Sequence, residues 1–262
     1  MNPVSATRLQ PLAGATVVIT RPAGEGVGFA RQARALGAAT VLLPGLSLRA
    51  PEDPERARRQ LRGDFDDWIF VSPLAVRQAF ALAPLGRLAD GSRAFGVGEG
   101  TRRALARRGV PAIAPATSSD SEGLLACAEL ADVRGHRIAL VGAPGGRGLL
   151  APALAARGAH VEEIHAYRRV PPRLTARHFA ALAGARDPLL MPVSSAAALA
   201  NLVTLLPEGL LGRLREQTLV ASSARLAALA AGAGFEDIVE AASAAPADLL
   251  AAAARALARH RL

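Results

Sequence analysis

Short apolar runs alternate along this chain with longer segments of helical periodicity. Ala15–Thr20 and Thr40–Pro44 are mostly apolar and predict two buried strands. Between them, Gly28–Leu36 repeats its apolar residues at helical spacing, and Gly37 follows as a helix-ending glycine. The order strand, helix, strand predicts a βαβ unit with parallel strands.

The same alternation continues through the middle of the chain. Apolar runs predict further strands at Trp68–Val71, Ala94–Val97 and Arg137–Val141. Helical patterns follow each of them, at Pro73–Leu82, Thr101–Arg108 and Leu149–Arg157. Strands that alternate with helices indicate the α/β class with parallel sheets.

The second half of the chain repeats landmarks of the first half. Gly37 and Gly158 each follow a predicted helix and lie 121 residues apart. Ser72 matches Ser194, and Thr101 matches Ser223, both at an offset of 122 residues. The repeat therefore predicts two similar parallel-sheet α/β domains formed by an internal duplication.

The repeated hydroxyl residues lie where predicted strands end and helices begin. Free N–H groups and the positive end of the helix dipole make such positions suitable for anions, and open parallel sheets bind ligands there. Each residue taken alone is also compatible with a simple helix N-cap. Four matched positions favour a shared binding function.

The charged residues of the chain limit the reactions and the partners that it can have. Among its 262 residues the net charge is +9, and all 31 basic residues are arginine. Without lysine, neither a P-loop nor a pyridoxal phosphate Schiff base is available in its usual form. The positive charge favours an anionic partner, either nucleic acid or a small molecule that carries several carboxylates or phosphates. Aromatic residues make up only 3%, which argues against base stacking and hence against nucleic acid.

The single cysteine limits the metal chemistry and the compartment. Cys127 cannot form an internal disulfide, and the five histidines add no cluster at zinc spacing. We therefore expect no metal and a reducing, cytoplasmic location. The N-terminal residues lack an apolar export segment, and no run of eighteen apolar residues occurs, so no membrane association is expected.

Two glycine-rich segments follow predicted strands. Gly96–Thr101 with Asp120 downstream has features of a dinucleotide fingerprint, but Thr101 replaces the third glycine. Gly142–Gly148 precedes a helix, so its amides could bind an anion, or it could be a simple left-handed turn.

Tyr167 is the only tyrosine, and two prolines follow it closely. Read alone, it is compatible with a residue at the edge of a core. As chemistry, a phenol stays protonated at neutral pH and can donate to a departing hydroxyl. Pro171 and Pro172 predict a segment that crosses between domains, with Pro44–Pro54 as its counterpart in the first copy.

From Val17 to about Leu250 the chain resembles the uroporphyrinogen-III synthase family. The resemblance rests on the order of short motifs: Ile19-Thr20-Arg21-Pro22, Val71-Ser72-Pro73, Phe95-Gly96-Val97-Gly98-Glu99-Gly100-Thr101, Gly145-Gly146-Arg147, Arg157-Gly158-Ala159, Ala166-Tyr167-Arg168-Arg169 and Val220-Ala221-Ser222-Ser223. The last motif is similar to the serine-containing form of a bacterial subset. The resemblance implies two α/β domains joined by a two-stranded linker, residues 1–45 with 168–262 and residues 46–167.

The resemblance also implies the activity and the site. It implies a cyclising lyase of porphyrin and haem biosynthesis that converts hydroxymethylbilane into uroporphyrinogen III, as a cytoplasmic monomer without a cofactor. Tyr167 is implied as the catalytic residue, facing a cleft between the domains. The implied binding residues are Thr20, Arg21, Ser72, Gly98, Thr101, Gly146, Arg147, Ser194, Ser195 and Ser223. The alternative is a two-domain protein that binds a small molecule without catalysis.

Overall fold

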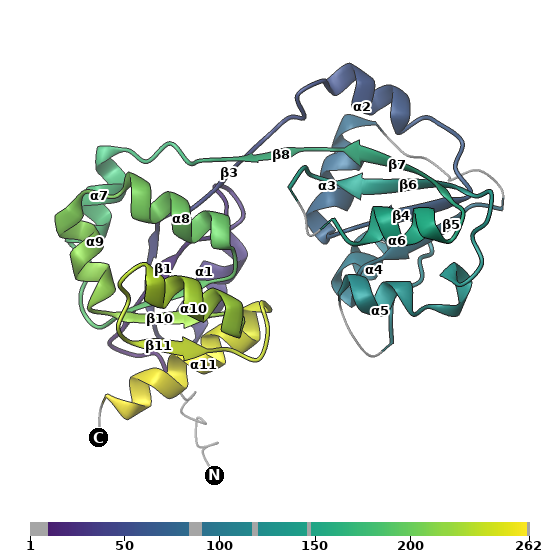
Figure 1. The fold of residues 1–262 in the computed structure, drawn as a ribbon. Helices are drawn as coiled ribbons and strands as arrows, with labels where there is room; N and C mark the ends of the chain where they lie inside the picture. The colour runs from purple at the N-terminus through teal and green to yellow at the C-terminus, as the bar shows by residue number, and fades with distance from the viewer. Residues whose placement is uncertain (1–9, 84–90, 117–119, 146–147, 261–262) are drawn as a thin grey trace, which may run out of the picture. The chain divides into compact units, whose positions relative to one another are not determined.

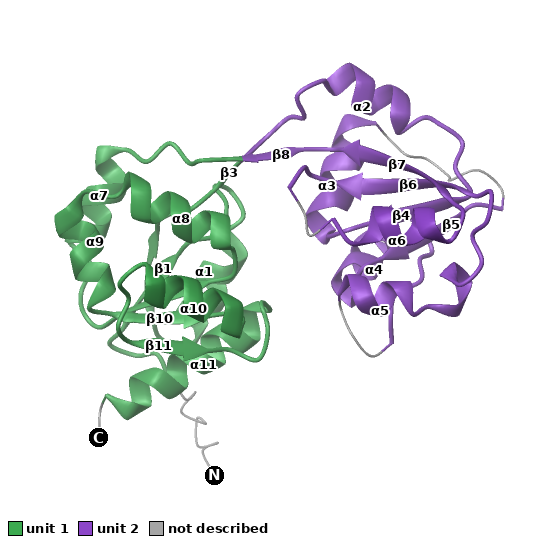
Figure 2. Ribbon diagram, viewed as in Figure 1, with its two compact units in different colours: residues 1–47, 170–262 green, residues 48–169 purple. Residues whose placement is uncertain are grey.

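The computed structural model describes residues 10–83, 91–116, 120–145 and 148–260. The chain divides into two compact units, drawn in green and purple in Figure 2. Unit 1 comprises Met1–Ser47 and Val170–Leu262, and unit 2 comprises Leu48–Arg169. Each crossing between units lies two residues later than the domain boundary that the sequence led us to expect.

Unit 1 is a five-stranded parallel sheet covered on both faces by helices (Figure 1). Its strands are ordered β11-β10-β9-β1-β2. Their bounds are β1 Thr16–Ile19, β2 Ala39–Leu42, β9 Leu189–Val193, β10 Thr218–Ala221 and β11 Ile238–Glu240. The helices are α1 Val27–Ala35, α7 Ala176–Ala183, α8 Ala196–Leu205, α9 Glu208–Arg215, α10 Ala224–Gly232 and α11 Pro246–Arg259.

Alternating side chains place the core of unit 1 on both faces of the sheet. Val17 and Ile19 pack on one face with α1 and α11, whereas Val18 packs on the other face with α8 and α10. All three are at most 2% exposed. Burial on both faces explains why these strands read as continuous apolar runs in the sequence.

Unit 2 is a four-stranded parallel sheet with the order β5-β4-β6-β7. The strands are β4 Asp67–Phe70, β5 Arg93–Gly96, β6 Arg137–Gly142 and β7 His160–His165. The helices are α2 Pro54–Gln60, α3 Pro73–Leu82, α4 Glu99–Ala106, α5 Ser121–Leu125 and α6 Leu150–Ala156, with a short 3₁₀ turn at Ala128–Leu130. An isolated parallel bridge between Phe95 and Ile113 extends the sheet beyond β5.

The strand orders of the two units correspond. In each unit the first two strands of one βαβ segment pair 23 residues apart, Thr16 with Ala39 and Arg137 with His160. These pairs are separated by 121 residues, the offset of the predicted repeat. Gly37 and Gly158 precede the second strand of each pair with φ values of 93° and 88°, which glycine adopts most readily. The correspondence is what an internal duplication would produce.

Two short strands carry the chain between the units. β3 (Ser47–Arg49) and β8 (Arg168–Val170) form a separate two-stranded sheet. The linker is therefore two-stranded.

A buried ion pair lies at the amino end of the unit 2 sheet. Asp67 is fully buried, and Arg93 donates to its two carboxylate oxygens from Nε at 2.6 Å and from Nη2 at 2.9 Å. Nδ1 of His136 lies 2.8 Å from the same carboxylate. The hydrogen bond to Asp67 raises the pKa of Arg93 above its usual value. This cluster lies at the amino ends of the strands, and the pockets described below lie at their carboxyl ends.

Within the described residues, no helix is both long and apolar enough to cross a membrane. The same part of the chain holds no group of three or more side chains placed to bind a metal ion.

Candidate active site

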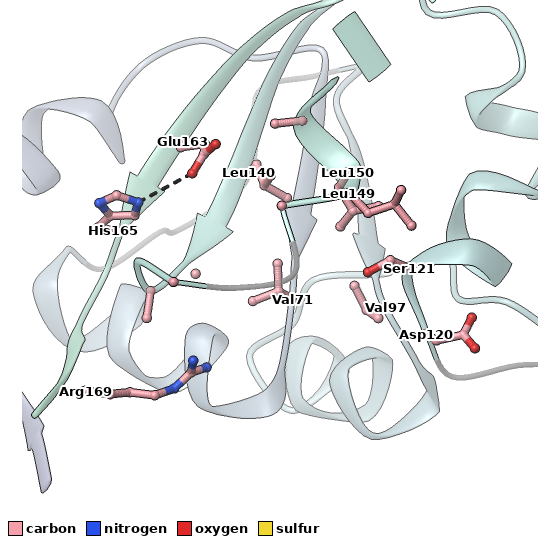
Figure 3. A pocket seen from close by; sticks show the side chains of 15 residues that line it. Val71, Val97, Asp120, Ser121, Leu140, Leu149, Leu150, Glu163, His165 and Arg169 are labelled. Carbon is pink, nitrogen blue, oxygen red and sulfur yellow. Dashed lines mark ion pairs between the residues drawn. The ribbon is translucent and has the colours of Figure 1, made fainter. Parts of the chain in front are cut away.

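A pocket of about 380 Å³ opens at the carboxyl ends of the unit 2 strands (Figure 3). We call it the glycine-loop pocket, because Gly142, Gly145 and Gly148 line it. Its apolar side chains are Val71, Val97, Leu140, Ala143, Leu149, Leu150 and Ala151, and its polar side chains are Asp120, Ser121, Glu163, His165 and Arg169. Its volume lies in the range of small-molecule sites.

A smaller hollow of about 220 Å³ adjoins this pocket and shares Val71 and Val97 with it. We call it the Ser72 hollow, and Gly98 and Thr101 also line it. Phe70 and Gly96 are paired in register, so the turns that follow β4 and β5 lie side by side. The structure thus brings three residues predicted from sequence, Ser72, Gly98 and Thr101, to one place.

Ser72 and Thr101 have different local roles, which corrects one sequence-based expectation. Ser72 is the N-cap of α3, and its Oγ accepts a hydrogen bond from the backbone N–H of Ala75 at 3.1 Å. Thr101 does not open α4, because Gly98 is the N-cap and Thr101 is the third helical residue. The side chain of Thr101 is buried at 3% exposure. The position equivalent to the N-cap Ser223 in unit 1 is therefore Gly98.

Unit 1 carries the other predicted residues at the carboxyl ends of its own strands. Thr20 is buried and donates from Oγ1 to the carbonyl of Pro192 at 2.8 Å. Arg21 donates from Nη2 to the carbonyl of Ala244 at 2.8 Å, and burial lowers the pKa of Arg21. Thr20 thus connects the end of β1 with β9, whereas Arg21 connects the turn after β1 with the turn before α11.

Of the three predicted serines in unit 1, two are helix N-caps and the third makes no hydrogen bond within the described structure. Ser195 caps α8 by accepting from Ala198 N–H at 3.3 Å, and Ser223 caps α10 by accepting from Leu226 N–H at 3.4 Å. The match of Ser72 with Ser194 is therefore wrong by one residue, because Ser195 is the N-cap. The Ser194 hydroxyl has no hydrogen-bond partner among the residues that the structure describes.

Tyr167 lies inside unit 2. Its side chain is 1% exposed and belongs to the core cluster that contains Trp68 and Phe70. Nη2 of Arg169 donates to the Tyr167 hydroxyl at 3.2 Å. Arg169 in turn lines the glycine-loop pocket, so the phenol connects to this pocket through one guanidinium.

Gly146 and Arg147 lie outside the described residues. The flanking Gly145 and Gly148 line the pocket with φ values of 78° and 65°, so left-handed turns border this segment. Asp120 is the N-cap of α5, where its Oδ1 accepts from Gly123 N–H at 2.8 Å. It does not follow a strand, as the acidic residue of a dinucleotide site does.

Four polar side chains of the pocket were not among the residues proposed from the sequence: Ser121, Glu163, His165 and Arg169. The His165 ring and the Glu163 carboxylate lie 3.5 Å apart on β7. The sequence carried a signal for Glu163 and His165. The segment from His160 to His165 directly precedes the motif around Tyr167, as expected for a strand whose carboxyl end lies near the site.

Two parallel α/β units, a two-stranded linker and, in unit 2, hollows at the carboxyl ends of the strands define a two-domain α/β protein with hollows where open parallel sheets commonly bind ligands. A family model described as "Uroporphyrinogen-III synthase HemD" matches residues 28–251. The uroporphyrinogen-III synthase of Salmonella typhimurium is 33% identical over 234 residues, 85% of this chain and 93% of the relative. The Escherichia coli enzyme is 30% identical over the same shares.

The chain therefore belongs to the uroporphyrinogen-III synthase family, a family of cyclising lyases in porphyrin biosynthesis. Solved structures agree on the fold. A mutant of the Thermus thermophilus enzyme matches with a TM-score of 0.60 and 22% identity, over 94% of this chain and all of that chain. The Helicobacter pylori enzyme matches with a TM-score of 0.57 and 13% identity, over 95% of this chain and all of that chain.

Proposed function

We propose that this chain cyclises hydroxymethylbilane to uroporphyrinogen III, with inversion of ring D and loss of water. The observation that carries the proposal is the family match over residues 28–251, which includes the whole carboxyl edge of unit 2. The net charge of +9 suits a substrate with eight carboxylates.

The chemistry requires control of geometry more than strong acid or base. Loss of the terminal hydroxyl leaves an azafulvene cation, and ring D attacks through its substituted carbon to form a spiro-pyrrolenine. Fragmentation and recombination then leave ring D inverted, whereas unassisted closure yields the uninverted isomer. Holding the flexible chain in the productive geometry can contribute about 7–11 kcal/mol to rate acceleration.

We assign carboxylate binding to hydroxyls and amides at the strand ends. The capping bond of Ser72 uses an oxygen lone pair, so its hydroxyl hydrogen remains available to a carboxylate. The same argument applies to the caps Ser195 and Ser223. N-capping and ligand binding are therefore compatible at these residues. Thr20, Arg21, Gly98, Thr101, Gly146, Arg147 and Ser194 complete the proposed set.

Tyr167 is our proposed catalytic residue. Its hydroxyl accepts from Arg169, which leaves its own hydrogen for donation to the departing hydroxyl of the substrate. Because Tyr167 is 1% exposed, this role requires local movement at the glycine-loop pocket.

We further propose that the enzyme is a cytoplasmic monomer that needs no cofactor. Cys127 is a free thiol, and burial raises its pKa, so the reactive thiolate is disfavoured. A free thiol of this kind suits a reducing compartment. Sedimentation of the purified protein would test the oligomeric state.

One assay tests the proposed activity directly. Fresh hydroxymethylbilane is incubated with the purified protein and, in parallel, without protein, and the ring isomers are separated by chromatography. We expect the type III isomer to predominate only with protein. Type I alone, in the amount formed without protein, would refute the proposal.

The serines offer a paired test of carboxylate binding. Ser194→Ala should raise the KM by up to about tenfold, because one hydrogen bond to a carboxylate is lost. Its thermal stability should not change, since this hydroxyl has no partner among the described residues. Ser72→Ala should also raise the KM, but loss of the α3 cap should cost about 1 kcal/mol of stability. Wild-type KM values in both variants would leave Ser72 as a cap only.

A further inference from the structure

One guanidinium connects the glycine-loop pocket with the buried phenol. Arg169 is an exposed residue of β8 that lines the pocket, and in Figure 3 its side chain points from β8 toward the pocket. Its Nη2 donates to the Tyr167 hydroxyl at 3.2 Å, and its Cζ lies 5.6 Å from the centre of the Tyr167 ring. The charged end of Arg169 therefore contacts both the ligand space and the only tyrosine of the chain.

Most donors of this guanidinium are uncommitted. Among the described residues, no group accepts a hydrogen bond from Nε or Nη1 of Arg169, and no carboxylate lies within ion-pair distance of it. The acidic residues of the same pocket have other partners. Glu163 pairs with His165 at 3.5 Å, and Asp120 accepts from Gly123 N–H at 2.8 Å. Arg169 therefore has no ion-pair partner among the described residues, although the carboxylates of Asp120 and Glu163 also line the pocket.

We infer that Arg169 binds one carboxylate of the linear tetrapyrrole in the glycine-loop pocket and, with the same guanidinium, orients the Tyr167 hydroxyl. This inference rests on the proposed function. The planar fork of arginine can bind a carboxylate with two parallel hydrogen bonds, while a further N–H is directed at the phenol oxygen. Arg169 is thus a substrate-binding residue and a positioning residue that acts through Tyr167.

The two roles of Arg169 predict separate effects on KM, through substrate binding, and on kcat, through Tyr167. Arg169→Gln should raise the KM for hydroxymethylbilane by about tenfold or more, because charge-assisted hydrogen bonds are lost. It should also lower kcat, because the phenol loses its donor. Arg169→Lys should restore the KM more than kcat, since an ammonium keeps the charge but lacks the planar fork.

A double-mutant cycle isolates the action through Tyr167. In a Tyr167→Phe background, Arg169→Gln should raise the KM as before and cause no further loss of kcat. Multiplicative losses of kcat in the two single variants and the double variant would overturn the positioning role. Wild-type KM and kcat in Arg169→Gln would overturn the inference as a whole.

Arg168 provides a matched control. It is the preceding residue of β8, is also exposed, and donates from Nε to the carbonyl of Ala50 at 3.2 Å without lining the pocket. Arg168→Gln changes the net charge equally. We expect its KM and kcat to stay within about twofold of wild type. A KM rise in Arg168→Gln equal to that in Arg169→Gln would show a general charge effect and overturn the inference.

Spectroscopy adds a readout that a purely structural effect would not produce. Since Tyr167 is the only tyrosine, subtracting the near-UV spectrum of the matching Tyr167→Phe protein, which keeps Trp68, isolates the tyrosine band from the overlapping tryptophan absorption. Arg169→Gln should shift the tyrosine band, whereas Arg168→Gln should not; an unshifted band in a folded Arg169→Gln protein would contradict the contact.

If wild type forms no type III isomer, the proposed function fails. If wild type forms it and the Arg169 variants match wild type, only this inference fails.

Discussion

Tyr167→Phe is expected to slow the chemical step by about 100-fold, the lower end of the range for loss of a positioned proton donor. The type III isomer should still form, because the groups that fold the substrate remain in place. The rate should be measured in single turnovers with excess enzyme, so that substrate binding and product release do not limit it. The KM should change less than the single-turnover rate, since the phenol acts mainly on the departing hydroxyl.

The Tyr167→Phe substitution removes the hydroxyl without changing the packing of the buried ring. Phenylalanine keeps the ring in the core cluster with Trp68 and Phe70, and only the hydroxyl that Arg169 contacts is removed. The thermal midpoint should therefore stay close to that of wild type. A single-turnover rate equal to that of wild type would exclude a catalytic role for Tyr167. A large drop in thermal midpoint would instead show that the hydroxyl serves the core.

The sheets were predictable because their strands are buried on both faces. Mostly apolar runs located β1, β4, β5 and β6 to within one or two residues. The predicted helix Pro73–Leu82 coincides with α3, where Ser72 caps the N-terminus and proline occupies the first helical position. In such segments, local signals and tertiary burial agree.

The linker strands carry a weaker signal. β3 and β8 contain three residues each, and β8 begins with two exposed arginines. Prolines near both crossings indicated a connection, but the pairing of the two strands followed only from the family resemblance. Segments this short have too few residues for a period to be visible.

The placement of site residues failed where loop lengths differ. The spacing between Ser72 and Thr101 equals that between Ser194 and Ser223, which suggested equivalent helix starts. In the sheets, however, the paired residues Phe70 and Gly96 are 26 apart, whereas Val193 and Ala221 are 28 apart. The equal spacing of the hydroxyl residues was therefore a coincidence, because the segments that connect the paired strand ends differ in length between the two units. A repeat inferred from residue types needs the strand register to place its N-caps.

Arg93→Gln is expected to lower the unfolding free energy of unit 2 by about 3–5 kcal/mol, because it leaves a buried carboxylate without its main partner. Asp67 is fully buried, and in the described structure the Arg93 side chain supplies the donor to its Oδ1. The reverse substitution, Asp67→Asn, should cost less, since the side chain of Arg93 is 33% exposed and can be hydrated. This asymmetry separates a buried-charge penalty from the simple loss of one contact.

The measurement can be restricted to unit 2. Trp68 is the only tryptophan, lies next to Asp67 in β4 and is 3% exposed, so its fluorescence reports the unfolding of this unit. Denaturant titrations should compare Arg93→Gln with Glu55→Gln, which removes an ion pair with Arg58 in which the glutamate is 70% exposed. Glu55→Gln should cost less than about 1 kcal/mol. Equal losses in the two variants would show that Arg93 contributes no more than a surface ion pair, and the ion cluster would then not be what stabilises the amino edge of the unit 2 sheet.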